Sequence, residues 1–266
     1  MTAHDDQKTA PLAPSLIRDI PFPLNVYAFL TCYNSGQFRE LHYGLFDDAD
    51  DSLEKAQGNS TELLLRHLPL PPHTILEVGV GFGHTFKTLT EKGFTCTGIS
   101  PDQTQIRITR SNTRDENLFC TGFEEMTEKS LFETIIFQES SQYIKPDDLF
   151  QKSNRLLVPD GRILLVDEFS TGGERLHNMT NFLSVAESNG FQLQNFTDLS
   201  RQAAPTVDYI LENLTAFHHS LLQDLPVTPE QLEELSRALQ LYRQNYSNGT
   251  FRYCFFEFRK GSEAIS

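Results

Sequence analysis

The sequence predicts a doubly wound α/β fold with a mostly parallel sheet, helices on both faces and an added helical cap. Over residues 74–197, strand-like and helix-like segments alternate, which is typical of parallel strands joined by helical crossovers. The apolar run that begins at Ile75 ends in three glycines, as a buried strand does where the chain turns sharply. Two further helical stretches follow, the second with a capping-box pattern at Thr228 and Gln231, and an aromatic-rich strand over residues 251–259 comes last.

The domain organisation follows the order of these segments. Residues 1–14 are polar and rich in Pro and Ala, which predicts a disordered tail and not a secretory signal. Residues 15–72 are expected to form an N-terminal helical lid dense in aromatic side chains, and residues 73–198 the cofactor-binding core. Residues 199–249 read as a helical insertion, either a cap over a ligand cavity or a dimer contact. Residues 250–266 contain the final strand and a C-terminal tail.

The composition excludes several classes of partner. A chain of 266 residues suits one large domain with a substantial core. The formal net charge of −14 disfavours nucleic acid, because phosphate binding needs clustered Lys and Arg. No apolar run is long enough to cross a bilayer, and the four cysteines lack CxxC spacing, so reduced thiols and a cytoplasmic location are expected. The acidic run over residues 47–54 reads as a solvated loop, and nothing in the sequence requires a metal.

The segment ILEVGVGFGHT carries the strongest signal for a ligand site. Glycines at positions 79, 81 and 83 allow a ligand to lie close against the backbone, where any Cβ would intrude. Their spacing is GxGxG after Glu77, and it differs from the GxGxxG that places a dinucleotide pyrophosphate on a helix N-terminus. An acid at this point favours a cationic ligand over a diphosphate.

This segment resembles the cofactor motif of the class I S-adenosylmethionine-dependent methyltransferases, in their small-molecule branch. Four later segments resemble motifs of the same family in the same order: SPDQTQIR, CTGFEEM, FETIIFQESSQYI and RLLVPDGRILLVDEF. The resemblance implies a Rossmann-like, seven-stranded sheet and S-adenosyl-L-methionine as cofactor. It also implies a set of cofactor-binding residues: Glu77, Gly79, Gly81, Gly83, Ser100, Asp102, Gln103, Phe123, Glu124 and Gln138.

Two of these positions depart from the family pattern. The second strand of the family usually ends in an acid that holds both ribose hydroxyls, and Ser100 stands there in this sequence. A serine lacks the two charged acceptors of a carboxylate, so Asp102 or Gln103 is expected to take over part of the task. Phe123 stands where the family has an acid beside the adenine.

Candidate catalytic residues come from two segments. Glu139, just past the fourth strand, matches family members whose ES pair faces the acceptor, and burial would raise its pKa toward that of a general base. Tyr143 and His42 are candidates for orienting the acceptor. The segment HYGLFDD, which contains His42, resembles one that closes over the cofactor in methyltransferases acting on sarcosine, tocopherols, prenyl diphosphates and fatty-acyl chains.

The acceptor and one rival function stay open. An acid among many aromatics suits an amine, and it suits equally an apolar chain or ring methylated at carbon or oxygen. The absence of a basic cluster disfavours acceptors that carry a diphosphate. A non-catalytic protein that only binds S-adenosylmethionine, or a scaffold, would share the glycine loop. A dehydrogenase is disfavoured by the GxGxG spacing, and a homodimer through the inserted helices is possible.

Overall fold

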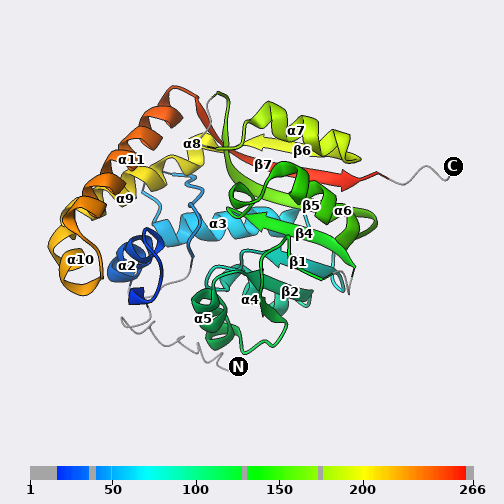
Figure 1. Cartoon of the computed structure of the whole chain (residues 1–266), viewed down its shortest axis with the longest axis horizontal. Coiled ribbons are helices and arrows are strands. Elements are labelled where there is room, and N and C mark those ends of the chain that lie inside the picture. Colours follow the sequence, from blue (N-terminus) through cyan, green and yellow to red (C-terminus); the bar gives the residue numbers. More distant parts are fainter. Residues whose placement is uncertain (1–16, 36–39, 49, 128–130, 173–175, 262–266) are drawn as a thin grey trace.

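A seven-stranded sheet forms the centre of the molecule, which we describe from a computed structural model (Figure 1). The description covers residues 17–261 apart from 36–39, 49, 128–130 and 173–175. The strands are β1 (Thr74–Val78), β2 (Thr95–Ser100), β3 (Leu118–Cys120), β4 (Phe132–Gln138), β5 (Leu157–Ser170), β6 (Phe191–Asp198) and β7 (Phe251–Lys260).

The strand order is β3-β2-β1-β4-β5-β7-β6. Strand β7 runs antiparallel to the other six strands, which are parallel to one another. This confirms the predicted doubly wound, mostly parallel sheet. The chain leaves β1 toward β2 on one side and later returns to pair β4 with β1 on the other. In such sheets the strand order reverses at this point, and ligands bind outside the carboxyl ends of the strands there. The ends of β1 and β4 are therefore the first place to look for a site.

Helices cover both faces of the sheet, as predicted. Because successive side chains of a strand point to opposite faces, Ile136 of β4 enters one apolar core and Ile135 enters the other. The first core is covered by α3 (Leu53–Arg66), α4 (His84–Glu91) and α5 (Gln103–Thr113), and the second by α6 (Pro146–Leu156) and α7 (Met179–Ser188).

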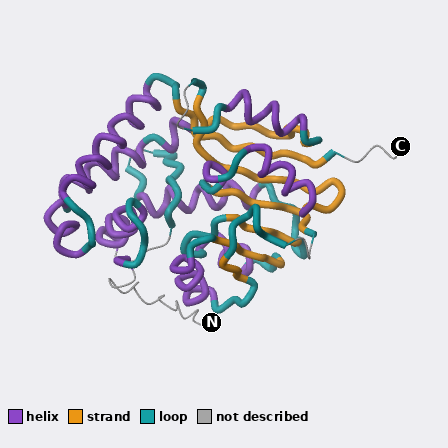
Figure 2. The backbone as a smooth tube through the Cα atoms, in the orientation of Figure 1, coloured by secondary structure: helices purple, strands orange, loops and turns teal. Residues whose placement is uncertain are grey.

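A separate group of helices lies beyond the carboxyl ends of the parallel strands (Figures 1 and 2). The group contains α2 (Leu24–Ser35), α8 (Ser200–Ala203), α9 (Pro205–Ala216), α10 (His218–Asp224) and α11 (Pro229–Ser247). The helix α9 contacts both α2 and α11, so a segment before the core and the inserted helices pack as one layer.

Two details of the inserted helices can be compared with the sequence. The capping box is present, since the Thr228 hydroxyl accepts from the Gln231 N–H and the Gln231 side chain accepts from the Thr228 N–H. The first stretch, expected as one helix, is two helices that meet at Phe217. This break keeps both Leu214 and Leu221 buried. No helix in the described part of the chain is long and apolar enough to cross a membrane.

Candidate active site

The glycine loop turns the chain from β1 into α4. Gly79, Gly81 and Gly83 all have positive φ, at 79°, 53° and 82°, a conformation that side chains with a Cβ adopt rarely. A Cβ on Gly79 or Gly83 would also overlap Ser140 or Thr109, at 2.6 and 2.3 Å. A Cβ on Gly81 would meet nothing closer than Leu41, at 3.9 Å. Gly79 and Gly83 are therefore required by packing, whereas Gly81 leaves open space beside the loop.

Glu77 stands one residue before the end of β1 and has an unsatisfied oxygen. Its Oε2 is buried and has no hydrogen-bond partner among the described residues. Burial, and to a smaller extent the Glu40 carboxyl, raises the pKa of Glu77 well above its usual range, while His42 opposes the shift. An unpartnered buried carboxyl oxygen just before a glycine loop fits a cationic ligand group, so Glu77 and the loop fit the cofactor that the sequence predicts.

The segment that contains His42 lies against this loop. Leu41 is the described side chain that a Cβ on Gly81 would approach first, at 3.9 Å, and the buried side-chain amide of Gln57 on α3 donates to the carbonyl of His42 at 2.8 Å. Nδ1 of His42 lies 2.9 Å from the Tyr43 carbonyl, and its Nε2 lies 3.2 Å from a Glu40 carboxyl oxygen. Burial lowers the pKa of His42, but Glu40 outweighs burial and raises it to about 9, so the imidazole is charged at neutral pH.

The residues predicted for the ribose lie at the turn from β2 into α5. The Ser100 hydroxyl donates to the Gln105 side chain at 2.9 Å and accepts from the Asp102 N–H at 3.1 Å, so its donor is already in use. Asp102 is the N-cap of α5, with Oδ1 accepting from two backbone N–H groups. Oδ2 of Asp102 accepts no hydrogen bond from the described residues and is the better-placed acceptor. Gln103 is exposed in the first turn of the helix.

The other predicted cofactor residues differ in the solvent exposure of their side chains. The Phe123 ring is buried in the second core, edge-on to Phe137, so a contact with adenine stays a prediction. Glu124 is exposed. Gln138 is buried, donates to the Ser60 hydroxyl and accepts from the Thr85 hydroxyl, at 3.0 Å each, so its amide joins β4 to α3 and α4.

Glu139 follows β4 directly and is held in one orientation. It has a positive φ of 54°, which turns the chain sharply at the sheet edge. Its Oε1 accepts from the Tyr43 N–H at 2.6 Å and from the Tyr253 hydroxyl at 2.5 Å. Oε2 accepts nothing from the described residues. Burial raises the pKa of Glu139 to about 7, although the charge of His42 opposes the shift. The carboxyl is therefore positioned and poised to exchange a proton near neutral pH.

A second buried acid nearby was missed at the sequence level. Glu168, near the end of β5, accepts a hydrogen bond from the Tyr246 hydroxyl of α11. Burial raises the pKa of Glu168 to about 8, and the Glu139 carboxyl adds to the shift. The Tyr43 and Tyr253 rings stack with their centroids 5.6 Å apart. We call these three tyrosines with Glu139 and Glu168 the acid–tyrosine pocket. The sequence signal that could have identified Glu168 is the presence of two acids in the otherwise apolar run VDEF.

The remaining candidate, Tyr143, makes no hydrogen bond to the residues of the acid–tyrosine pocket. It stands on the short helix η1 (Ser141–Tyr143), and its ring is 75% exposed, with no hydrogen bond to the described residues. The buried Asp167 holds this loop, since it accepts from the Ser141 hydroxyl at 2.6 Å and from the Gln142 N–H at 3.1 Å. Tyr143 thus has a fixed backbone and a free ring.

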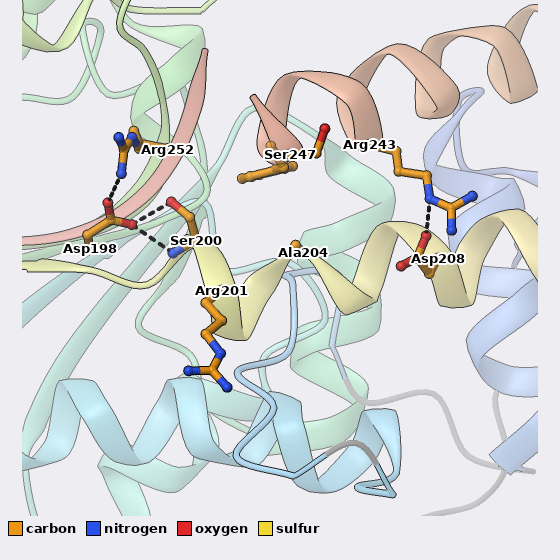
Figure 3. Close-up of a pocket in the computed structure, with 9 residues that line it drawn as sticks. Asp198, Ser200, Arg201, Ala204, Asp208, Arg243, Ser247 and Arg252 are labelled. Carbon is orange, nitrogen blue, oxygen red and sulfur yellow. Dashed lines mark hydrogen bonds and ion pairs between the residues drawn. The ribbon is translucent and has the colours of Figure 1, made fainter. Parts of the chain in front are cut away.

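A groove of about 520 Å³ lies between α8–α9 and the C-terminal end of α11, beside β7 (Figure 3). Arginine–aspartate pairs line it, including Arg243 with Asp208 and Arg252 with Asp198. None of the residues predicted from the sequence lines this groove. Its link to the candidate site is Tyr246, which lines the groove and bonds to Glu168. We therefore place the chemistry at the sheet edge and not in the groove.

Parts of the chain are similar to known methyltransferases. Residues 76–165 match the protein-family model described as a methyltransferase domain. The chain is 26% identical over 201 residues to methyltransferase GfsG of Streptomyces halstedii, covering 64% of this chain and 72% of that protein. The match to the family model includes the glycine loop, Glu139 and most of β5.

Solved structures share the fold at low identity. The mycolic acid cyclopropane synthase CmaA1, solved with S-adenosylhomocysteine, superposes with a TM-score of 0.75 at 20% identity, covering 96% of each chain. The [4+2]-cyclase SpnF gives a TM-score of 0.75 at 19% identity, covering 89% of this chain and 93% of its own. The methyltransferase domain matched over residues 76–165, together with the strand order, supports a class I S-adenosylmethionine-dependent methyltransferase with S-adenosylmethionine as its cofactor.

Proton release on cofactor binding is the first testable consequence. In the empty site burial favours the protonated form of Glu77, because it raises the pKa well above its usual range. An ammonium group beside Glu77 favours the carboxylate, so binding of S-adenosylhomocysteine should release up to one proton and should tighten as pH rises. Calorimetry in phosphate and in Tris, which differ in ionisation enthalpy, measures this proton. Identical heats in the two buffers would contradict the protonation state assigned to Glu77.

Proposed function

We propose that this enzyme transfers the methyl group of S-adenosylmethionine to an oxygen or nitrogen atom of a small molecule held in the acid–tyrosine pocket. When bound, the cofactor supplies a methyl group that is already activated. The protein then has two tasks, to hold the nucleophile in line with that methyl at about 3 Å and to exclude water. Residues 40–46 and α9–α11, which lie over the carboxyl edge of the sheet, support such a closed pocket.

Glu139 is proposed as the general base. The observation that supports this role is that the two carboxyl oxygens of Glu139 differ in their contacts. Oε1 accepts two hydrogen bonds, which fix the carboxyl, and Oε2 has no hydrogen-bond partner among the described residues. A base must reach the proton it removes, and its pKa works best near the operating pH. Glu139 meets the second condition with a pKa of about 7. Oε2 would take the proton of the acceptor hydroxyl or amine as that acceptor atom bonds to the methyl carbon, while the bond from the methyl carbon to sulfur breaks and S-adenosylhomocysteine leaves.

The polarity of the pocket favours an acceptor that carries a hydroxyl or amine. The walls around Glu139 contribute Glu168 and three tyrosines, and a purely aliphatic chain would leave these groups without a polar ligand. His42 is the cation that acts on Glu139, and it is already paired with Glu40. The negative charge of a diphosphate would therefore have little positive charge to pair with at this site. A phosphate-free small molecule therefore fits best, and α10 and α11 stay available for a dimer contact.

A non-catalytic role is the alternative. SpnF shares this fold and is named as a [4+2]-cyclase, so the fold alone does not guarantee methyl transfer. The positioned carboxyl of Glu139 supports the catalytic role, because a scaffold has no need for it. We further propose that the enzyme works in the cytoplasm, since the cysteines whose side chains are described, Cys96, Cys120 and Cys254, are free thiols.

The pH dependence of turnover tests the base. Only the ionised form of Glu139 accepts a proton, so kcat/KM should rise with pH through about 7 and level off above it. The Tyr253 hydroxyl stabilises the ionised form, so Tyr253→Phe should move the rise to higher pH. Steady-state rates between pH 5.5 and 9 measure both. A flat profile, or a shift to lower pH in the variant, would contradict the role of Glu139.

A further inference from the structure

Three buried polar atoms around the glycine loop have no hydrogen-bond partner among the residues that the structure describes. They are Glu40 Oε1, His42 Nε2 and Glu77 Oε2, and their residues are 7%, 7% and 3% exposed. A buried polar atom without a partner costs about 1 to 3 kcal/mol, more when it is charged. Three such atoms around one loop indicate a ligand that satisfies them together.

Nε2 of His42 takes part in an ion pair but in no hydrogen bond to the described residues. Nε2 lies 3.2 Å from Glu40 Oε2, close enough for a charge interaction, but its N–H does not point at that oxygen. The other Glu40 oxygen lies 3.9 Å from Nε2 of His84, the first residue of α4, immediately after Gly83. Glu40 therefore lies between His42 and the end of the glycine loop.

The same three side chains act on one another electrostatically. Glu40 raises the pKa of Glu77, and His42 lowers it. His42 is charged because of Glu40, so the charges of these two side chains offset each other, while burial favours the neutral form of Glu77. A ligand that adds one positive and one negative charge keeps this balance. An ammonium offers donors to the two acid oxygens, and a carboxylate offers an acceptor to the free N–H of His42.

We propose that Glu40 and His42, together with Glu77, bind the amino-acid end of S-adenosylmethionine: the two acids take its ammonium and His42 takes its carboxylate. This inference rests on the cofactor assignment and extends it to two residues that precede the core. Segment 40–44 is anchored to the core, since Gln57 donates to the His42 carbonyl and Gly44 donates to the Thr206 hydroxyl.

The arrangement couples cofactor binding to the base. His42 is followed directly by Tyr43, whose N–H holds Glu139 Oε1 at 2.6 Å. A cofactor that fixes His42 therefore also fixes the donor that orients Glu139. The segment over residues 40–44 is thus both a binding element and a positioning element.

Two ligands separate this proposal from a structural role for the segment. S-adenosylhomocysteine carries the amino-acid end, and 5′-methylthioadenosine has the same adenine, ribose and sulfur without it. Calorimetry would measure both on the wild type, Glu40→Gln, His42→Asn and Glu62→Gln. Asn at position 42 keeps a donor near Nδ1 and removes Nε2. Glu62 is an exposed acid on α3 and controls for the loss of one negative charge.

The expected result is selective. Glu40→Gln and His42→Asn should each weaken S-adenosylhomocysteine about 10- to 100-fold, the range of one charge-assisted hydrogen bond, and leave 5′-methylthioadenosine within about threefold. Equal loss for both ligands, or no loss for either, would overturn the proposal. If neither variant folds, the wild type decides, because a deaminated S-adenosylhomocysteine that binds as tightly as the parent also overturns it. If the wild-type protein bound neither ligand, the assignment of S-adenosylmethionine as the cofactor would be wrong.

Discussion

Glu139→Gln should lower kcat by about 10²- to 10⁴-fold and leave the affinity for S-adenosylhomocysteine unchanged. Glutamine has the size of glutamate and its side-chain oxygen can still accept from the Tyr43 N–H and the Tyr253 hydroxyl, so the loop should keep its shape. What the variant loses is the ability to take a proton at Oε2. Single-turnover rates with a methylated product as readout separate this loss from product release.

The controls for this variant come from the same chain. Glu62→Gln, at an exposed position on α3, should turn over at the wild-type rate. The pH profile of the residual activity in Glu139→Gln should lose the rise near pH 7, because the group responsible is gone. A Glu139→Gln enzyme as fast as the wild type would show that catalysis is positioning alone.

Gly81→Ala should weaken S-adenosylhomocysteine by about 100-fold or more while the domain stays folded, since a Cβ placed against the ligand cannot move away. Among the described residues that Cβ would contact Leu41 alone, at an ordinary contact distance of 3.9 Å. The cost in stability should be about 1 kcal/mol, from the positive φ of 53°. Calorimetry and thermal unfolding of the same preparation measure the two effects.

Gly83→Ala is the matched contrast. Its Cβ would lie 2.3 Å from the Thr109 side chain of α5, at a φ of 82°, so overpacking and backbone strain act together. We expect a loss of about 2 to 4 kcal/mol of folding free energy. If Gly81→Ala unfolded the protein, or bound S-adenosylhomocysteine normally, the ligand would not lie beside this loop.

The parts of the fold that the sequence predicts are those set by local pattern. The alternation of strands and helices, the glycine turn after β1 and the capping box at Thr228 each depend on residues within a few positions of one another, and the structure contains all three. The break at Phe217 was not predicted, because the apolar stripe continues through it and the packing that divides α9 from α10 is tertiary.

The candidate site divides in the same way. Glu77 and Glu139 stand at strand ends within motifs, so their positions follow from the sequence. The bond between Tyr246 and Glu168 joins residues 78 positions apart, and the contact of Tyr43 with Glu139 spans 96. No periodicity or spacing reports such pairs. Ser100 illustrates the opposite case: its place at the end of β2 follows from the motif, whereas the use of its hydroxyl within the turn required the structure.

Methyl transfer itself is the most direct test of the account. The wild-type enzyme would be incubated with S-adenosylmethionine labelled in its methyl group and with a small-molecule metabolite extract, and the products would be followed by mass spectrometry. We expect a labelled product in which the methyl group is attached to oxygen or nitrogen, and we expect it to be at least 100-fold less abundant at equal times with Glu139→Gln. Tight binding of S-adenosylhomocysteine with no labelled product from the wild type, or equal product from both enzymes, would contradict base-assisted methyl transfer in this pocket.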